Sequence, residues 1–413
     1  MSKKGRGILK MRREEKGITL VALIITIVVM LILVAVSINV IVNSNLIGYS
    51  EKTGDAYSGA IKNEENFGND GITINDKEYA SIDDYIESRK PLPEGAGKKF
   101  TETKEYTDGT KTAVIPGGFK VSGIRKETRI DEGLVIYLIP DDEIENVKWD
   151  GTEKTKYDQF VWIPVSNANK MFMCQAKTES DSGCDLKIEG NEVICQTHKT
   201  ADATKSKNMA GRLYATGAGE SFNSSLTTQT YNANSGLREP AKLSSTNSSF
   251  VDQEEEPNLD LQTEYNNAVK KVIESKGFWI GRYETTGMSS SNDDIAVNIV
   301  AGKGTSDGIG DVNWYRMYKQ QQNYANKKNL DTSKIQSTMI FGAAYDQTMI
   351  FANCEKATTS AKDYSAVITG NVETDCYKNI YDLCGNLREW TTEANNTYYR
   401  ISRGRQLWRQ YFC

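Results

Sequence analysis

A long uncharged apolar run near the N-terminus constrains this chain more than any other feature. Residues 18–42, ITLVALIITIVVMLILVAVSINVIV, contain no charged side chain over 25 positions. A helix rises about 1.5 Å per residue, so a helix over this run would exceed the roughly 30 Å hydrocarbon core of a bilayer. The sequence therefore predicts a transmembrane helix. Residues 1–17 carry seven Lys and Arg against two Glu, which places them in the cytoplasm and residues 43–413 outside.

The junction between the basic leader and the apolar run is more specific than a plain anchor. Lys16-Gly17 precedes Ile18-Thr19-Leu20, and this junction resembles the type IV prepilin cleavage and methylation signal. The resemblance implies that a membrane prepilin peptidase cuts after Gly17 and methylates Ile18. The family usually has Glu at the fifth mature position, where this chain has Ala22. Processing is therefore better supported than incorporation throughout a filament shaft among other pilin subunits.

Two further interpretations of the apolar run stay open. One is an uncleaved signal anchor. The second is a secretory signal cleaved near the small residues Ala35-Val36-Ser37, although its apolar region would be longer than the usual 7–15 residues or so.

Charge and histidine content exclude several classes of function. The chain has 50 Lys and Arg against 55 Asp and Glu, a formal net charge of −5. A net acidic body without a long basic run argues against nonspecific nucleic-acid binding, because that binding depends on neutralising phosphates. His198 is the only histidine, which excludes three-His zinc centres, two-His facial triads and HExxH chemistry.

The seven cysteines lie in the predicted exported part, where disulfides can persist. The odd number leaves at least one of them unpaired or in an intermolecular bond. Cys174, Cys184 and Cys195 fall within 22 residues, so a local bridge is a reasonable expectation, although spacing does not assign it. The chain has no CxxC pair and His198 stands alone, so we expect no zinc site.

The composition divides the chain into a leader, a membrane helix, a stalk and one large domain. We assign residues 1–17 to the basic cytoplasmic leader, 18–42 to the transmembrane helix, 43–99 to the stalk and linker, and 100–413 to the domain. A Ser/Thr/Asn-rich insertion at about 197–258 lacks the apolar content to offset its ordering entropy.

Short apolar runs and helical spacing predict the elements of the exported part. The expected strands are 71–74, Ala113–Ile115, Phe119–Val121, Gly133–Ile139, Phe160–Val165 and 278–286. Helices are expected around Ile82–Ile86, over 261–276 with Asp260 as N-cap and Gly277 as the stop, and around Trp314–Gln321.

Four separated segments carry a family resemblance in the large domain. They are FVWIPV (160–165), GFWIGRYETT (277–286), VNWYRMY (312–318) and NIYDLCGNLREW (379–390), the last followed by RISRG (400–404). In this order they resemble the formylglycine-generating-enzyme, or sulfatase-modifying-factor, domain, a variant of the C-type-lectin fold. The expected fold class is therefore α+β, with a transmembrane, pilin-like helix followed by a loop-rich, irregular C-type-lectin-like domain.

The last of these segments contains two carboxylates on either side of a tight turn. Asp382 and Glu389 flank Gly385-Asn386, and a turn that folds both carboxylates toward its own carbonyls would suit calcium. The resemblance implies such a site, with the Asp382 and Glu389 side chains and the carbonyls of Gly385 and Leu387 as ligands. A surface turn with two solvated carboxylates is the alternative.

The C-terminal segment argues against catalysis. Catalytic members of the family hold copper with two cysteines just after an RGGSW-like segment, whereas this chain reads RGRQLWRQYFC and offers Cys413 alone. Related iron oxidases use several histidines, which this chain lacks. No copper or iron centre is therefore expected. The same region is where retroelement-diversified lectin-fold proteins carry variable residues. The candidate ligand surface comprises Asn395, Asn396, Tyr398, Tyr399 and Trp408.

The sequence thus predicts a non-catalytic, pilin-like cell-surface protein, and Ala22 favours the role of a minor or tip subunit. Its extracellular domain would bind an unknown protein or glycan ligand, with calcium as a structural cofactor, and no nucleic acid. The alternatives are a membrane-tethered oxidase of the family, a retroelement-diversified binding protein and a purely structural subunit.

Overall fold

The computed structural model describes residues 72–79, 81–140, 155–177, 183–211, 261–302, 312–353, 369–370, 375–383, 389–394 and 400–403. The chain forms two units, Met1–Lys90 and Pro91–Cys413. In the first unit, strands β1 (Ile72–Ile74) and β2 (Lys77–Tyr79) form an antiparallel hairpin followed by helix α3 (Ile82–Arg89). The strand at 72–74 and the helix at 82–89 confirm the two elements expected there.

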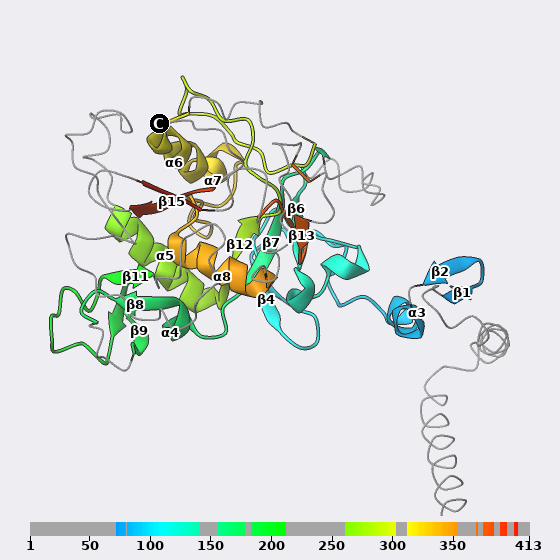
Figure 1. Ribbon diagram of the computed structural model, residues 1–413, viewed down its shortest axis with the longest axis horizontal. Helices are drawn as coiled ribbons and strands as arrows, with labels where there is room; N and C mark the ends of the chain where they lie inside the picture. Colours follow the sequence, from blue (N-terminus) through cyan, green and yellow to red (C-terminus); the bar gives the residue numbers. More distant parts are fainter. Residues whose placement is uncertain are drawn as a thin grey trace, which may run out of the picture. The chain divides into compact units, whose positions relative to one another are not determined.

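A four-stranded antiparallel sheet forms the centre of the second unit (Figure 1). Its order is β12-β7-β6-β5, with β5 at Phe119–Val121, β6 at Val135–Leu138, β7 at Gln159–Pro164 and β12 at Gly277–Gly281. These strands confirm four of the predicted runs.

The two faces of β12 meet different cores, as its alternating sequence predicts. Phe278 and Ile280 pack against the cluster that contains Val161 and Ile163. Trp279 points to the opposite cluster and lies opposite Trp162 in register, with ring centroids 5.0 Å apart. Both faces of the sheet are therefore covered by apolar side chains.

Helix α5 (Leu261–Ser275) confirms the helix expected over 261–276, but its end differs from the prediction. Lys276, not Gly277, takes the left-handed conformation at the helix end, with φ of 57°. Gly277 is required for another reason: a Cβ there would lie 2.3 Å from the Trp162 ring. Asp260, the predicted N-cap, lies outside the described residues.

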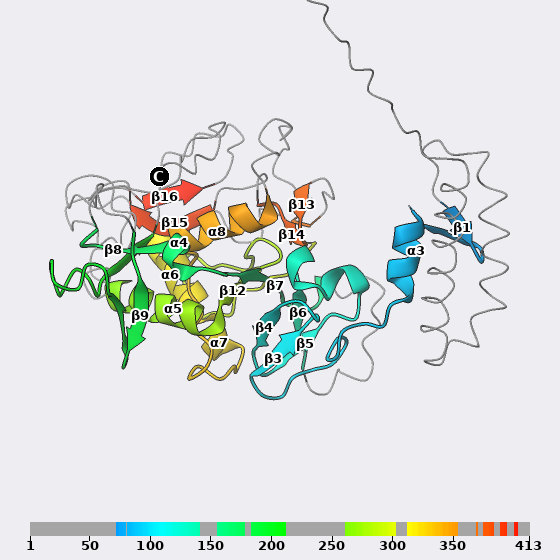
Figure 2. The same cartoon turned by 90° about the horizontal axis from the view of Figure 1, so that it is seen from below.

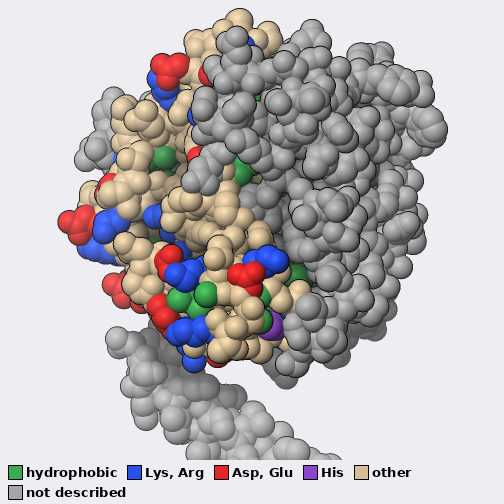
Figure 3. Space-filling model, turned by 90° about the vertical axis from the view of Figure 1, so that its left-hand side faces the viewer, with side chains coloured by type: hydrophobic (Ala, Val, Ile, Leu, Met, Phe, Trp, Pro, Cys, Tyr) green, Lys and Arg blue, Asp and Glu red, His purple; other side chains and the backbone are tan. Residues whose placement is uncertain are grey.

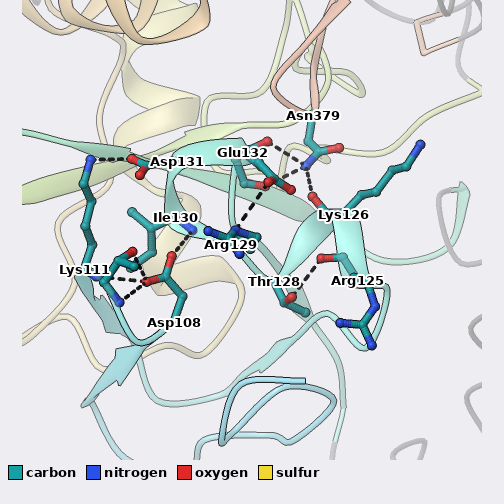
Figure 4. Close-up of polar contacts among 12 residues, drawn as sticks. Asp108, Lys111, Arg125, Lys126, Thr128, Arg129, Ile130, Asp131, Glu132 and Asn379 are labelled. Carbon is teal, nitrogen blue, oxygen red and sulfur yellow. Dashed lines mark hydrogen bonds and ion pairs between the residues drawn. The ribbon is translucent and has the colours of Figure 1, made fainter. Parts of the chain in front are cut away.

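A second group of elements lies before β5 and between β5 and β6 along the chain. Strands β3 (Lys104–Thr107) and β4 (Thr112–Ile115) form a hairpin, followed after β5 by the 3-10 helices η3 (Arg125–Glu127) and η4 (Ile130–Glu132). The Asp108 carboxylate accepts hydrogen bonds from the backbone N–H groups of Thr110, Lys111 and Ile130 (Figure 4). This carboxylate therefore joins the hairpin turn to η4.

The short hairpin β13 (Cys376–Tyr377) and β14 (Ile380–Tyr381) docks on the same region. The Asn379 amide donates to the carbonyl oxygens of Lys126, Glu132 and Gly133 at 2.7–3.2 Å (Figure 4). Gly133 has φ of 94°, and a Cβ there would lie 1.9 Å from the Lys378 carbonyl oxygen. This close approach explains why glycine occupies position 133.

In the described part of the chain, three helices follow β12. They are α6 (Trp314–Gln322), α7 (Tyr324–Lys327) and α8 (Gly342–Ala352). α6 confirms the helix expected around Trp314–Gln321, and the Asn313 side chain caps it by accepting from the Arg316 N–H. α8 packs on β7 and on β15 (Glu389–Ala394), which pairs with β16 (Arg400–Arg403).

A lobe of short strands lies at one end of the second unit, away from β4, β5 and β6 (Figures 1 and 2). We call residues 168–177 and 183–211 the cysteine lobe. It contains α4 (Ala168–Met171), β8 (Phe172–Cys174) paired with β11 (Met209–Gly211), and the hairpin of β9 (Leu186–Glu189) with β10 (Glu192–Cys195).

The fold class predicted from the sequence is wrong. No helix in the described part of the chain combines the length and the apolar character needed to cross a membrane. The described residues instead form a mixture of short helices and small antiparallel sheets. The predicted membrane helix at 18–42 lies outside the described residues, as do the leader at 1–17 and the Ser/Thr/Asn-rich positions 212–258.

Candidate metal centre

Three cysteines and the single histidine meet inside the cysteine lobe. The ligand atoms of Cys174, Cys184, Cys195 and His198 all lie within 4.8 Å of one another, and all four residues are buried. We call this cluster the Cys3His centre. None of its three cysteines forms a disulfide.

The local fold brings the four residues together from different elements. Cys174 ends β8, Cys184 lies just before β9, and Cys195 ends β10 opposite Leu186. His198 lies in the turn that follows β10. Its backbone carbonyl accepts a hydrogen bond from the Ala201 N–H. The β9–β10 hairpin therefore returns the chain to the end of β8. The start of β9, the end of β10 and the following turn meet there.

The distances suit a tetrahedral ion. Cys174 Sγ and Cys184 Sγ lie 3.7 Å apart. His198 Nδ1 lies 3.2 Å, 3.7 Å and 3.1 Å from the sulfurs of Cys174, Cys184 and Cys195. Zinc bonds of about 2.3 Å to sulfur and about 2.0–2.1 Å to nitrogen place tetrahedral ligands about 3.5–3.8 Å apart. A small adjustment around an ion would satisfy these bonds.

The same distances argue against a preformed disulfide. A disulfide needs its sulfurs about 2.03–2.05 Å apart, much closer than the 3.7 Å between Cys174 and Cys184. A bridge between these two residues would also leave Cys195 and His198 buried beside it with no ion to share. The arrangement therefore favours a metal over a bridge.

The thiols interact strongly with one another. Hydrogen bonding between the Cys174 and Cys184 thiols raises the pKa of Cys174 and lowers that of Cys184 to about 5. The Cys174 backbone N–H also donates to Cys184 Sγ at 3.2 Å, which favours a thiolate there. Burial raises the pKa of Cys195. A divalent cation would stabilise thiolates at all three positions, because metal ligation deprotonates thiols.

The centre sits in an apolar environment. Its cysteines belong to the cluster that contains Tyr265 and Val269 of α5 and Phe341 just before α8. The lobe is also joined to α5 by hydrogen bonds, from Gln175 to Gln262 and from the Met209 N–H to the Asn266 side chain. An ion at the centre would thus tie the lobe to the rest of the core.

Four protein ligands close a tetrahedral zinc site. Structural zinc sites are bound by four protein side chains, whereas catalytic sites keep a position for water or substrate. Cys174, Cys195 and His198 are at most 6% exposed, and Cys184 is 9% exposed. The centre therefore suits a structural ion.

The sequence contained one signal for this centre that spacing arguments missed. The expected absence of zinc rested on the missing CxxC pair and the isolated His198. Cys195 and His198 nevertheless stand three positions apart, at the end of a strand. The remaining two ligands reach them through strand pairing, which sequence spacing does not reveal.

The predicted calcium ligands are described in part. Asp382 is buried, and its Oδ2 accepts from Thr369 Oγ1 at 2.7 Å and from the Gly370 N–H at 2.9 Å. Its Oδ1 has no hydrogen-bond partner among the described residues, and burial raises the pKa of Asp382. Glu389 begins β15, whereas Gly385 and Leu387 lie outside the described residues. Calcium stays a prediction.

The remaining predicted site residues lie outside the described part of the chain. These are the processing positions Gly17 and Ile18 and the candidate ligand surface Asn395, Asn396, Tyr398, Tyr399 and Trp408. Prepilin processing, the cell-surface location and the ligand surface therefore stay predictions.

Charged side chains are mixed over the face of the molecule drawn in Figure 3. Its described part carries basic and acidic side chains interspersed with apolar ones. Several exposed charges are paired, among them Lys199 with Glu189 and Lys207 with Glu192 in the cysteine lobe.

Comparison with known proteins gives no relative: no family model, no curated protein and no solved structure matches the chain.

Proposed function

We propose that this chain is a non-catalytic binding protein whose second unit is held together by a structural zinc ion at the Cys3His centre. The observation that carries the proposal is the meeting of four buried ligand atoms within 4.8 Å of one another. Thiolate and imidazole ligands favour zinc over calcium or magnesium, which prefer oxygen.

A stabilising role follows from where the centre lies. It connects β8, the β9–β10 hairpin and the turn at His198, all of them short elements. Binding of structural zinc contributes directly to folding free energy, with apparent values of about 10–16 kcal/mol in zinc-finger peptides. Zinc would therefore hold together the short strands of a lobe whose apolar core is shared with α5 and α8.

The binding role extends the expectation drawn from the sequence. A closed zinc site has no position for a substrate, and a single histidine limits other metal chemistry. We keep a protein or glycan, the ligand expected from the sequence, as the proposed partner.

The test is metal analysis of the full chain purified under reducing conditions without chelator. We expect one zinc per chain, and we expect cobalt substitution to give the intense near-ultraviolet absorption of thiolate coordination. Cys195→Ser and His198→Ala should each lower zinc content well below one per chain. Cys376→Ser is the matched control, because Cys376 lies outside the centre, and should keep full zinc content.

Two results would contradict the proposal. One is a folded wild-type chain that holds no zinc after dialysis against buffered zinc. The second is a Cys174–Cys184 disulfide in peptides mapped from the native protein.

A further inference from the structure

Three side chains from distant parts of the chain meet outside the Cys3His centre with the groups needed for amide exchange. Lys328 Nζ lies 3.0 Å from Asn298 Oδ1 and 2.7 Å from Asp158 Oδ2. Lys328 follows α7, Asp158 immediately precedes β7, and Asn298 lies in the segment between β12 and α6. The amine is therefore in contact with both a carboxamide and a carboxylate.

The surrounding backbone fixes these three groups. Asp158 Oδ1 accepts from the Ile299 N–H at 2.7 Å, which holds the carboxylate beside Asn298. Asn298 exchanges two backbone hydrogen bonds of 2.9 Å with Thr286. Tyr324 donates its hydroxyl to Asp158 Oδ2 at 2.9 Å, and its carbonyl accepts from the Lys328 N–H at 2.9 Å. The backbones of Asn298 and Lys328 and the carboxylate of Asp158 are thus each held by a partner that does not react.

The site is largely protected from water. The Asp158 side chain is 4% exposed and that of Lys328 is 20% exposed. Val297, Ile299 and Tyr324 form one buried cluster around them. In such a setting the attraction between the carboxylate and the ammonium is screened less than in water, because the local dielectric is lower.

We propose that Lys328 and Asn298 join in an intramolecular isopeptide bond, with Asp158 as the proton carrier. The Lys328 ammonium gives a proton to the Asp158 carboxylate and becomes a neutral amine. The lone electron pair of the amine nitrogen then attacks Asn298 Cγ. The C=O electron pair moves to Oδ1, which takes the proton from Asp158. Collapse of this intermediate breaks the Cγ–Nδ2 bond, and Nδ2 leaves with one amine proton as ammonia. The Oδ1 proton then passes to the ammonia, which restores the carbonyl and gives ammonium.

The reaction balances without any co-reactant. One ammonium and one carboxamide become one secondary amide and one ammonium ion, and no atom changes its oxidation state. Held geometry makes this slow reaction feasible, because well-oriented groups reach effective molarities of about 10⁵ M or more. The amide carbon is one bond beyond the oxygen that Lys328 already contacts.

A second Lys–Asn contact in the same unit serves as an internal comparison. Lys270 Nζ lies 3.4 Å from Asn191 Oδ1 at an exposed position. The carboxylate that pairs with Lys270, Glu274, is 3.9 Å away and 51% exposed. This pair lacks a buried proton carrier, so we expect it to stay unreacted.

The test is mass spectrometry of the denatured full chain and of its tryptic peptides. We expect a wild-type peptide in which the segment ending at Lys303 is joined to the segment that begins at Lys328, one ammonia lighter than the sum of the two. Trypsin should fail to cut after Lys328. The peptides that carry Asn191 and Lys270 should be found separately and at full mass.

Variants identify the reacting groups. Lys328→Arg and Asn298→Ala should each restore separate peptides at full mass, whereas Lys327→Arg, which changes the adjacent lysine, should keep the linked peptide. Asp158→Asn should lower the linked fraction at least tenfold while melting curves report whether the variant folds. Full-mass wild-type peptides with normal cleavage after Lys328 would overturn the proposal, and this result depends on no variant.

Discussion

Arg282 holds a buried polar network at the centre of the second unit. Its guanidinium pairs with Glu127 at 2.7 Å and donates to Gln159 Oε1 at 3.0 Å and to the Tyr137 hydroxyl at 3.3 Å. The Glu127 carboxylate also accepts from Tyr137 and from Ser122. A charge buried in this way is tolerated because the Glu127 carboxylate neutralises it. Arg282 Nε has no hydrogen-bond partner among the described residues.

Removal of the Arg282 charge should therefore be costly. Arg282→Met leaves Glu127 buried without its countercharge, and breaking a buried pair on one side costs about 3–5 kcal/mol of unfolding free energy. Urea denaturation measures this loss. The double variant Arg282→Met with Glu127→Gln should recover part of it, since no unpaired charge remains.

An exposed pair gives the matched comparison. Lys111 and Asp131 are about half exposed, so Lys111→Met should change the unfolding free energy by less than about 1 kcal/mol. A similar small change in Arg282→Met would contradict the importance given to the buried network.

Single helices and strands could be predicted where the spacing of their apolar residues followed either the helical or the strand period. α5 and α6 present one apolar face, and β12 alternates between two cores. α8 was not expected, because its first residues, from Gly342 to Asp346, are all buried and show no helical period. Asp346 is buried there because it forms an ion pair with Arg403. The two residues are 57 positions apart in the sequence, so no local pattern reveals the contact.

The turn after β14 carries the prediction made for calcium. If calcium binds there, Asp382 and Glu389 supply two of its ligands, and a ligand in hundredfold excess over Kd raises stability by about 2.7 kcal/mol. Melting curves of the full chain in calcium and in a calcium-selective chelator measure the difference. Asp382→Ala and Glu389→Ala should each remove most of it.

The buried Asp382 Oδ1 is the structural observation behind this test. Identical wild-type curves in calcium and in chelator would mean that the segment is only a turn. Zinc must be kept constant in both samples, so that loss of the Cys3His ion is not mistaken for loss of calcium.

At the scale of the whole molecule, the cysteine lobe and the central sheet are stabilised by different means. The sheet is covered on both faces by apolar side chains, whereas the lobe shares its core with the Cys3His centre. The strands of the sheet could be predicted from the sequence because each is a short, mostly apolar run. It could not predict the centre, because the strand pairing that assembles it depends on the folded hairpin.

Removal of zinc should therefore affect the two regions unequally. After treatment with a strong zinc chelator under reducing conditions, backbone amides of β8, β9 and β10 should exchange with deuterium much faster. Amides of β6 and β7 should keep most of their protection. Hydrogen exchange with peptide-level mass spectrometry measures both, and His198→Ala should reproduce the pattern without chelator. Equal loss of protection in both regions would contradict a local role for the ion.

The three hydrogen bonds of Asn379 have a consequence for synthesis of the protein on the ribosome. Their acceptors at Lys126, Glu132 and Gly133 lie 253, 247 and 246 positions earlier in the chain. Those carbonyls reach their final partner only after at least 246 further residues have been translated. Contacts of such long sequence separation slow folding. The segment that holds these carbonyls therefore lacks its final partner until Asn379 has been synthesised. A chaperone has most to protect during this interval.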